Sequence, residues 1–314
     1  MREPPEHLDP AELLDVVRTQ WDEAVDRLEH LPVGFGAHHW AASVEQSRRY
    51  FVTFDRLAPK RSCEGLERAY CAAASLSSSG LEFVLASLSS VSGGFTVPLG
   101  TGAVSVTPWT AGRSGSGSFA NEAEALETAS HLGRLHASKF PPGIPVWEPV
   151  VRADLGEGLS RRIAEPSPSG PFGERARAAV AAHLSAVYEW VRRYVVLTER
   201  AERTYQTWVP THGEPDTGNQ LVTPTRRLLV DWESLALAPR ERDLDGLLAS
   251  SADWQRAYGN HEPDAQMLEM FDLEWRLSEI AEYAAWFRAP HTGTASDTIA
   301  FGGLIQELGR PDRR

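Results

Sequence analysis

The sequence contains little cysteine, little lysine and no long hydrophobic run. Cys63 and Cys71 are its only cysteines, so neither a disulfide framework nor a zinc site is expected. No hydrophobic stretch approaches the ~20 residues that a membrane-spanning helix needs. The first ten residues contain no apolar signal core, so secretion is not expected. These absences together predict a soluble, cytoplasmic protein.

Positive charge is scarce as well. The chain has 31 Lys and Arg residues against 43 Asp and Glu residues, which gives a formal net charge of −12. Nucleic-acid binding requires a clustered basic face, so this balance argues against it. Lys60 and Lys139 are the only lysines, and any reaction that needs a lysine has only these two candidates. With 314 residues, of which 42% are hydrophobic, the chain can form one or two domains with a substantial core.

The first hundred residues read as a mixture of helix and sheet. Apolar residues recur at helical spacing over 9–29, where Asp9 can cap the helix and Pro10 fits its first position. The segment 48–57 is rich in β-formers and predicts a strand. A helix is expected over 63–76, followed by two short strands over 95–100 and 103–109.

The second part of the chain reads as mainly helical. The Gly- and Ser-rich segment 110–120 is a domain boundary or a mobile loop. Helices are expected over 121–138, 174–207 and 264–288. The exception is 211–247, which predicts a hairpin with strands 220–223 and 228–231. Its polar residues gather at the entrance and the exit, which is typical of functional sites.

Three side chains of this hairpin are candidates for catalysis. Asn219 and Asp231 come side by side when the hairpin closes, and together they offer the oxygen ligands that Mg²⁺ prefers. Glu214, at the start of the loop, can accept a hydrogen bond from a substrate hydroxyl. Phosphoryl transfer needs a metal ion at the phosphates and a carboxylate that orients the nucleophile. The hairpin therefore predicts a phosphoryl-transfer site.

The same residues resemble a known family. HGEPDTGN at 212–219 and LLVDWE at 228–233 are similar to the catalytic motifs of the aminoglycoside phosphotransferase and choline-kinase-like superfamily, which contains small-molecule relatives of the protein kinases. PRERDL at 239–244 and LGRLHAS at 132–138 match as well, and the resemblance extends over nearly the whole chain.

The resemblance implies an α+β, bilobal protein-kinase-like fold. A small antiparallel-sheet N-lobe over 1–107 binds the nucleotide, and a mainly helical C-lobe over 108–314 holds the catalytic loop and the acceptor. The cofactors implied are ATP or GTP together with Mg²⁺.

Further site residues follow from the resemblance. Glu214 occupies a position where the family usually has aspartate, so its carboxylate is one methylene further out. His212 and Asp243 are expected to support the catalytic loop rather than to react. The remaining residues belong to a phosphate-covering turn and to an interlobe hinge whose backbone contacts adenine: Gly34, Gly36 and His38 for the turn, and Pro108, Trp109 and Thr110 for the hinge.

The chain departs from the family at the lysine that contacts the nucleotide phosphates. Thr53 stands in its place on the strand over 48–57, although Glu67 follows where the family's helix glutamate would pair with that lysine. Lys60, which comes soon after the strand, is one candidate for the phosphate contact. An arginine or His38 is another.

Three functions compete on this basis. The first is phosphorylation of a hydroxyl on an antibiotic, which gives resistance or self-protection. The second is a metabolic kinase for a choline-, homoserine- or sugar-like substrate. The third is a nucleotide-binding pseudokinase, which Thr53 favours and the set of Glu214, Asn219 and Asp231 disfavours.

The acceptor is expected to be a hydroxylated small molecule, with no nucleic-acid or membrane partner. Residues 250–290 contain eight acidic side chains interleaved with aromatic ones. This pattern fits the solvated face of an amphipathic helix. It fits equally well a cleft that attracts a cationic antibiotic by charge and cation–π contact.

Overall fold

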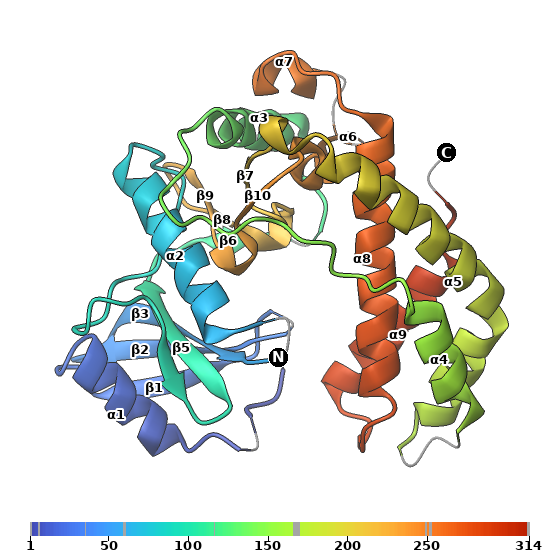
Figure 1. The fold of residues 1–314 in the computed structure, drawn as a ribbon. Helices are drawn as coiled ribbons and strands as arrows, with labels where there is room; N and C mark the ends of the chain where they lie inside the picture. Colours follow the sequence, from blue (N-terminus) through green and yellow to red (C-terminus); the bar gives the residue numbers. More distant parts are fainter. Residues whose placement is uncertain are drawn as a thin grey trace. The chain divides into compact units, whose positions relative to one another are not determined.

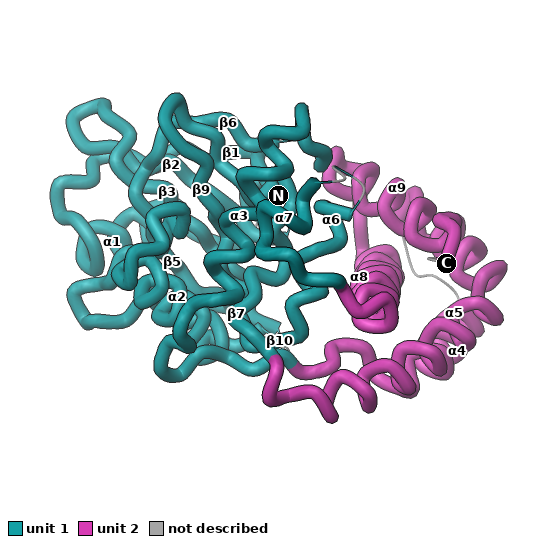
Figure 2. Tube along the Cα trace, turned by 90° about the horizontal axis from the view of Figure 1, so that it is seen from above, with its two compact units in different colours: residues 1–147, 208–262 teal, residues 148–207, 263–314 magenta. Residues whose placement is uncertain are grey.

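The computed structural model describes residues 2–5, 7–34, 36–58, 61–115, 117–165, 170–248, 250 and 253–312. The chain forms two compact units (Figure 2). The first contains residues 1–147 and 208–262, and the second contains residues 148–207 and 263–314. The N-terminal sheet and the hairpin with the candidate catalytic residues therefore belong to one unit. The division into a nucleotide-binding segment 1–107 and an acceptor-binding segment 108–314 stays a prediction.

An antiparallel sheet forms the N-terminal part of the first unit, as Figure 1 shows. Among the described residues it has five strands in the order β1-β2-β3-β5-β4, and each neighbouring pair is antiparallel. The strands are β1 (Arg27–Leu31), β2 (His38–Val44), β3 (Ser47–Arg56), β4 (Val97–Leu99) and β5 (Gly102–Pro108). The strands predicted over 48–57, 95–100 and 103–109 are confirmed.

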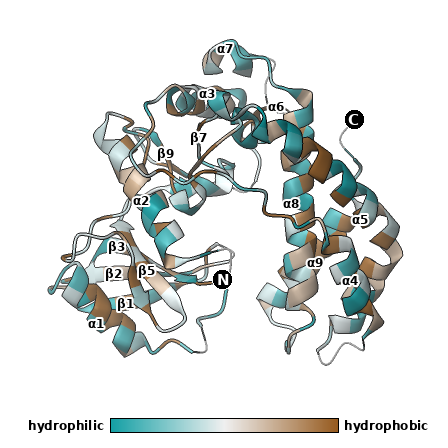
Figure 3. Cartoon of the chain, viewed as in Figure 1, coloured by the Kyte–Doolittle hydropathy of each residue, from teal (hydrophilic) through white to brown (hydrophobic). Residues whose placement is uncertain are grey.

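Helix α1 (Pro10–Gln20) packs on one face of this sheet. It begins after Asp9, whose side chain accepts a hydrogen bond from the N–H of Ala11 at 2.8 Å and so caps the helix. Hydrophobic and hydrophilic positions alternate along the helix, as expected of one buried face (Figure 3). The buried core between helix and sheet consists of Leu13, Val17, Val25, Trp40, Ala42, Val52, Phe54, Leu99, Val104 and Val106.

The helix predicted over 9–29 is wrong beyond Gln20. Asp22 accepts hydrogen bonds from the N–H of Ala24 at 3.0 Å and from the Tyr50 hydroxyl at 2.8 Å, which fixes a turn after α1. The residues that follow then form β1 and pair with β2. Strand pairing satisfies the backbone of this segment, so tertiary contacts override its helical periodicity.

The opposite face of the sheet meets helix α2 (Cys63–Ser78). Ser62 caps this helix by accepting from the N–H of Gly65 at 3.0 Å. Tyr70 of α2 is buried and donates to Asp55 of β3 at 3.3 Å. Asp55 shares this face with Thr53, because alternate residues of a strand point to the same side. The helix predicted over 63–76 is confirmed.

The rest of the first unit surrounds the hairpin with the candidate catalytic residues. Strands β8 and β9 form the hairpin, close to the predicted 220–223 and 228–231. The Gly- and Ser-rich segment supplies β6, which pairs with β8. The helices are α3 (Glu122–His136), α6 (Asp245–Leu248) and α7 (Trp254–Tyr258); the strands are β6 (Arg113–Ser114), β7 (Val209–Thr211), β8 (Gln220–Val222), β9 (Arg227–Leu229) and β10 (Ala236–Ala238); the short 3₁₀ turns are η1 (Tyr205–Thr207, in the second unit), η2 (Thr217–Asn219), η3 (Trp232–Ser234) and η4 (Arg240–Asp243).

The second unit is helical. Its helices are α4 (Leu155–Ala164), α5 (Gly173–Glu202), α8 (Ala265–Trp286) and α9 (Ala295–Gly309). The helices predicted over 174–207 and 264–288 correspond to α5 and α8, whereas α4 and α9 were not predicted. Among the described residues, no helix is both long and apolar enough to span a membrane. An antiparallel sheet followed by a mainly helical part confirms the expected α+β class.

The packing of α3 against α7 depends on a glycine. A Cβ atom at Gly133 would lie 2.2 Å from the Tyr258 carbonyl oxygen. We expect Gly133→Ala to lower the free energy of unfolding by about 1–3 kcal/mol, because overpacking strains a tight contact. Chemical denaturation measures the loss. Gly246→Ala is the control, since Gly246 is exposed in α6 and its added Cβ has no neighbour within 4 Å. Equal losses in the two variants would contradict the close contact.

Candidate active site

The loop after β7 is held from behind by one buried carboxylate. Asp243 accepts hydrogen bonds from the backbone N–H groups of His212 and Gly213, both at 2.7 Å. His136 of α3 contacts the same carboxylate through Nε2 at 2.9 Å. Burial raises the pKa of Asp243, but the hydrogen bond and the charge of His136 outweigh burial and leave the pKa lowered. The carboxylate therefore stays ionised as a double acceptor for the loop.

His212 links this loop to the strand that precedes Asp231. Its Nδ1 accepts from the N–H of Glu214 at 3.3 Å, so its Nε2 carries the proton that is donated to the Val230 carbonyl at 2.8 Å. Burial lowers the pKa of His212, which agrees with this neutral form. The ring thus fixes the backbone on both sides of the candidate site.

Asn219 and Asp231 lie at adjoining ends of the hairpin. The N–H of Val230 donates to the Asn219 carbonyl at 3.0 Å, which places Asp231 directly beyond that contact. Asp231 adopts a left-handed backbone conformation with φ 65° and ψ 65°, which is strained for a residue with a Cβ. Strain of this kind persists only where the surrounding structure imposes it, and it gathers at functional sites.

The donor atoms at this position fit a hard divalent cation. The Asn219 side-chain nitrogen donates to the Glu214 carbonyl at 2.9 Å, so the amide turns its Oδ1, an acceptor, toward the other side. Asp231, which lies at the adjoining end of the hairpin, is exposed to solvent. One amide oxygen and one carboxylate leave the remaining positions of a Mg²⁺ ion to water and phosphate, which is its usual environment.

Negative charge accumulates around Asp231. The surrounding protein raises the pKa of Asp231 to about 7, first through desolvation and then through repulsion from Asp55 and Glu214. The positive charge of Arg61 opposes this rise of the pKa. Glu214 and Asp231 therefore lie near enough to interact, as the sequence predicts for carboxylates of one site.

The Gly- and Ser-rich segment covers the catalytic loop closely. The N–H of Gly115 donates to the Thr217 carbonyl at 2.8 Å, and the N–H of Gly117 donates to the Thr217 hydroxyl at 2.8 Å. A Cβ atom on Gly115 would lie 2.4 Å from Thr217. Glycine is needed here for close approach. The described part of this segment is an integral support of the loop.

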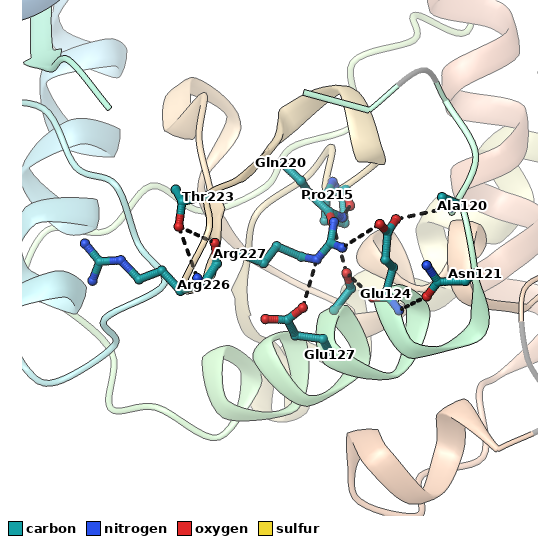
Figure 4. Close-up of polar contacts among 10 residues, drawn as sticks. Ala120, Asn121, Glu124, Glu127, Pro215, Gln220, Thr223, Arg226 and Arg227 are labelled. Carbon is teal, nitrogen blue, oxygen red and sulfur yellow. Dashed lines mark hydrogen bonds and ion pairs between the residues drawn. The ribbon is translucent and has the colours of Figure 1, made fainter. Parts of the chain in front are cut away.

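A second support comes from α3 through a buried polar network (Figure 4). Arg227 is buried, donates to the Gln220 side-chain oxygen at 2.8 Å and contacts Glu127 at 3.2 Å. Because the Gln220 oxygen accepts from Arg227, the amide nitrogen faces the other way and donates to the Pro215 carbonyl at 2.8 Å. The network thereby fixes the peptide between Pro215 and Asp216, one residue beyond Glu214. Sequence analysis missed both residues, since a buried arginine has no periodic signal.

The structure places the residues expected in the phosphate-covering turn at two different locations. Gly34 and Gly36 lie in the turn between β1 and β2 and have positive φ angles of 70° and 100°. His38 is buried on the sheet face that packs against α1, where its Nδ1 contacts the Glu3 carbonyl at 3.1 Å. Its neighbour His39 instead faces Thr53, with 3.2 Å between Nδ1 and the hydroxyl.

The other nucleotide-binding candidates show different surroundings. Pro108 ends β5, with Trp109 and Thr110 directly after it, and the N–H of Trp109 donates to the Arg49 carbonyl at 2.8 Å. Glu67 accepts from the backbone N–H groups of Phe95 and Thr96, so its carboxylate braces that loop and not Thr53. Lys60 lies outside the described residues.

A cluster that the sequence did not reveal connects β3 to the segment after Asp231. Arg61 lies 2.5 Å from a Glu233 carboxylate oxygen and 3.6 Å from Asp55, and Tyr70 donates to the same Asp55. These residues are far apart in the chain, which is why no spacing pattern pointed to them. Together they join the sheet, α2 and the strand end that presents Asp231.

Many of the acidic residues of 250–290 have partners of their own. Within the second unit Asp264 pairs with Arg200, Glu269 with Arg193 and Asp272 with Arg310, while Glu274 accepts from the buried hydroxyl of Tyr194. In the first unit Asp253 lies 3.7 Å from Arg256. These contacts favour the interpretation that much of the acidic surface is structural.

Comparison with known proteins identifies related chains. The model of the phosphotransferase enzyme family named APH matches residues 27–286. Protein StrN of Streptomyces griseus is 37% identical over 102 residues, which are 32% of this chain. The matched stretch spans 30% of that relative's length.

Solved structures share the fold over nearly the whole chain. A spectinomycin phosphotransferase, in complex with ADP and spectinomycin, aligns with a TM-score of 0.75 at 16% identity and covers 98% of this chain and 96% of its own. A microcompartment-associated aminopropanol kinase aligns with a TM-score of 0.56 at 13% identity, with coverages of 96% and 95%. At these identities the likeness establishes the fold alone.

The buried Arg227 offers a test of the loop support. We expect Arg227→Met to lower the free energy of unfolding by about 1–3 kcal/mol, because it leaves the Gln220 oxygen without its charged donor. The loss stays below that of a fully buried ion pair, because the two carboxylates that face Arg227 keep part of their surface in solvent, 17% of the side chain in Glu124 and 44% in Glu127. Thermal and chemical unfolding measure it. Arg226→Met is the matched control, because Arg226 is the exposed neighbour. A stable Arg227→Met protein would rule out the supporting role.

Proposed function

We propose that this chain, which belongs to the phosphotransferase enzyme family, phosphorylates a hydroxyl group of an antibiotic, with Glu214, Asn219 and Asp231 as its catalytic residues. The proposal places the reaction in the cytoplasm, with ATP or GTP as donor and with resistance or self-protection as the outcome. The observation that carries it is the strained Asp231 beside Asn219 and Glu214 on one braced hairpin.

The roles follow from the contacts of each side chain. Glu214 accepts the proton of the acceptor hydroxyl, while its backbone is fixed by His212 and Asn219. Asn219, through its side-chain oxygen, and Asp231, through its carboxylate, would hold Mg²⁺. When bound, Mg²⁺ supplies positive charge that neutralises the phosphate oxygens. The hydroxyl oxygen bonds to the terminal phosphorus, the bond from that phosphorus to the nucleoside diphosphate breaks, and the proton passes to Glu214.

The choice of acceptor depends on the relatives. The structural neighbour that phosphorylates spectinomycin favours an antibiotic, and the aminopropanol kinase favours a metabolic amino alcohol as the second candidate. Spectinomycin and aminopropanol both carry amino groups. A cationic acceptor is therefore part of the proposal, although several acids of 250–290 already have partners.

Glu214→Gln separates catalysis from binding. The amide keeps the shape of the side chain but cannot take a proton, so we expect kcat to fall by about 10²–10⁴-fold while nucleotide affinity is retained. Coupled detection of nucleoside diphosphate release measures kcat, and calorimetry measures the affinity. Asp216→Asn, an exposed acid of the same loop, controls for loss of charge alone. Loss of nucleotide affinity in Glu214→Gln would move Glu214 to the metal site.

A panel of acceptors tests the substrate proposal. Amino-sugar and aminocyclitol antibiotics are expected to be phosphorylated faster than neutral antibiotics, choline, homoserine or aminopropanol. Their apparent affinity is expected to weaken as salt screens the acidic surface, because exposed charges interact only within about 10 Å at 0.1 M salt. Turnover confined to the metabolic alcohols would establish the second candidate. Turnover of neutral antibiotics alone would remove the cationic acceptor and keep the kinase.

A further inference from the structure

The site around Asp231 has an unbalanced charge. Asp55, Asp231 and Glu233 interact with one another, and Glu214 adds a fourth carboxylate. The phosphates of a bound nucleotide would bring further negative charge to this place. A bound Mg²⁺ would offset part of this charge. A side-chain cation beside the phosphates would offset more of it, and Thr53 on β3 cannot supply one.

The histidines near Thr53 do not provide that charge. Burial lowers the pKa of His38 to about 4 and the pKa of His39 to about 3, so both rings are neutral at pH 7. Arg242 is engaged behind the loop, where it donates to the Thr211 hydroxyl at 3.1 Å and to the Ser234 carbonyl at 2.8 Å. It supports the backbone from the side of Gly213.

Arg61 is held in a different way. Its guanidinium forms ion pairs with two carboxylates from separate elements. One is Glu233, two residues after Asp231, and the other is Asp55 of β3. Its side chain is 35% exposed, and the contacts with Asp55 and Glu233 occupy only part of its fork of five donors. Its charge acts on Asp231 as well. A planar guanidinium that is held by carboxylates through some of its N–H groups can donate the others to phosphate oxygens.

From this geometry we propose that Arg61 binds the phosphates of the nucleotide, and that Asp55 and Glu233 position its guanidinium for this contact. The inference rests on the proposed nucleotide site. It assigns to a side chain beyond β3 the role that Thr53 cannot fill, and it makes Asp55 and Glu233 positioning residues.

Binding of ADP and adenosine to Arg61 variants tests the assignment without any acceptor. For Arg61→Ala we expect ADP affinity to fall by about 10- to 100-fold, since a hydrogen bond to a charged group is lost. Adenosine affinity is expected to stay within about twofold, because adenosine has no phosphate. Calorimetry with Mg²⁺ present measures both. Arg61→Lys is expected to recover part of the ADP affinity through its charge.

Two sets of controls make the outcome decisive. Arg56→Ala removes an exposed arginine of β3 from the opposite face of the sheet and is expected to leave both affinities unchanged. Lys60→Ala tests the neighbouring lysine, and a loss of ADP affinity there with none in Arg61→Ala would overturn the proposal. So would equal losses of ADP and adenosine affinity in Arg61→Ala, which indicate a structural role.

The remaining outcomes separate this inference from the proposed function. If Arg61→Ala does not fold, Arg61→Gln keeps a donor to Glu233 without the charge, and the same difference between ADP and adenosine applies. Wild-type protein that binds neither ligand contradicts the nucleotide site itself. Wild-type protein that binds both ligands with equal affinity contradicts the phosphate contact alone.

Discussion

The site depends on the buried carboxylate of Asp243. It accepts two backbone hydrogen bonds from the catalytic loop and one contact from His136, while the Tyr258 hydroxyl lies 2.5 Å from the other ring nitrogen of that histidine. A buried carboxylate without such donors would cost several kcal/mol. Here the loop itself provides the donors. The loop conformation that stabilises the ionised carboxylate of Asp243 is therefore the same conformation that positions Glu214. The same hydrogen bonds therefore stabilise the fold and set the position of Glu214.

Much of this arrangement was accessible from the sequence. The hairpin and its two strands are close in the chain and are confirmed, because their spacing reflects a local structure. The catalytic roles of Glu214, Asn219 and Asp231 stay a prediction. The α+β class, which the family resemblance implies, is confirmed, and most of the strands and helices also carry their own periodicity. The helix expected beyond Gln20 failed because β1 gains its hydrogen bonds from β2, which local periodicity does not register.

The parts that the sequence did not reveal are contacts between distant segments. Arg61 and Glu233 are 172 positions apart, and Arg227 contacts Glu127 across 100 positions. Each of these ion pairs is recognisable only once the fold is formed, because arginine and glutamate are common on any surface. The glycines of one segment also suggested a property that local composition cannot decide. The segment 110–120 has the composition of a mobile loop. At Gly115, however, a glycine is required because Thr217 lies too close for a side chain to fit. Composition alone does not distinguish freedom from close contact.

The interleaved order of the two units also governs how the chain is made. The first unit is completed by residues 208–262, and the segment 148–207 of the second unit is synthesised before them. During translation the sheet and α3 therefore wait for β7–β10, with Asp55 and Arg61 still lacking Glu233 and His136 still lacking Asp243. Domains on a ribosome usually fold from the N-terminus onward as each becomes complete. Here neither unit is contiguous, so the loop with Glu214 is assembled late. A nascent chain that ends before residue 243 leaves His136 and the backbone N–H groups of His212 and Gly213 without the carboxylate that they contact.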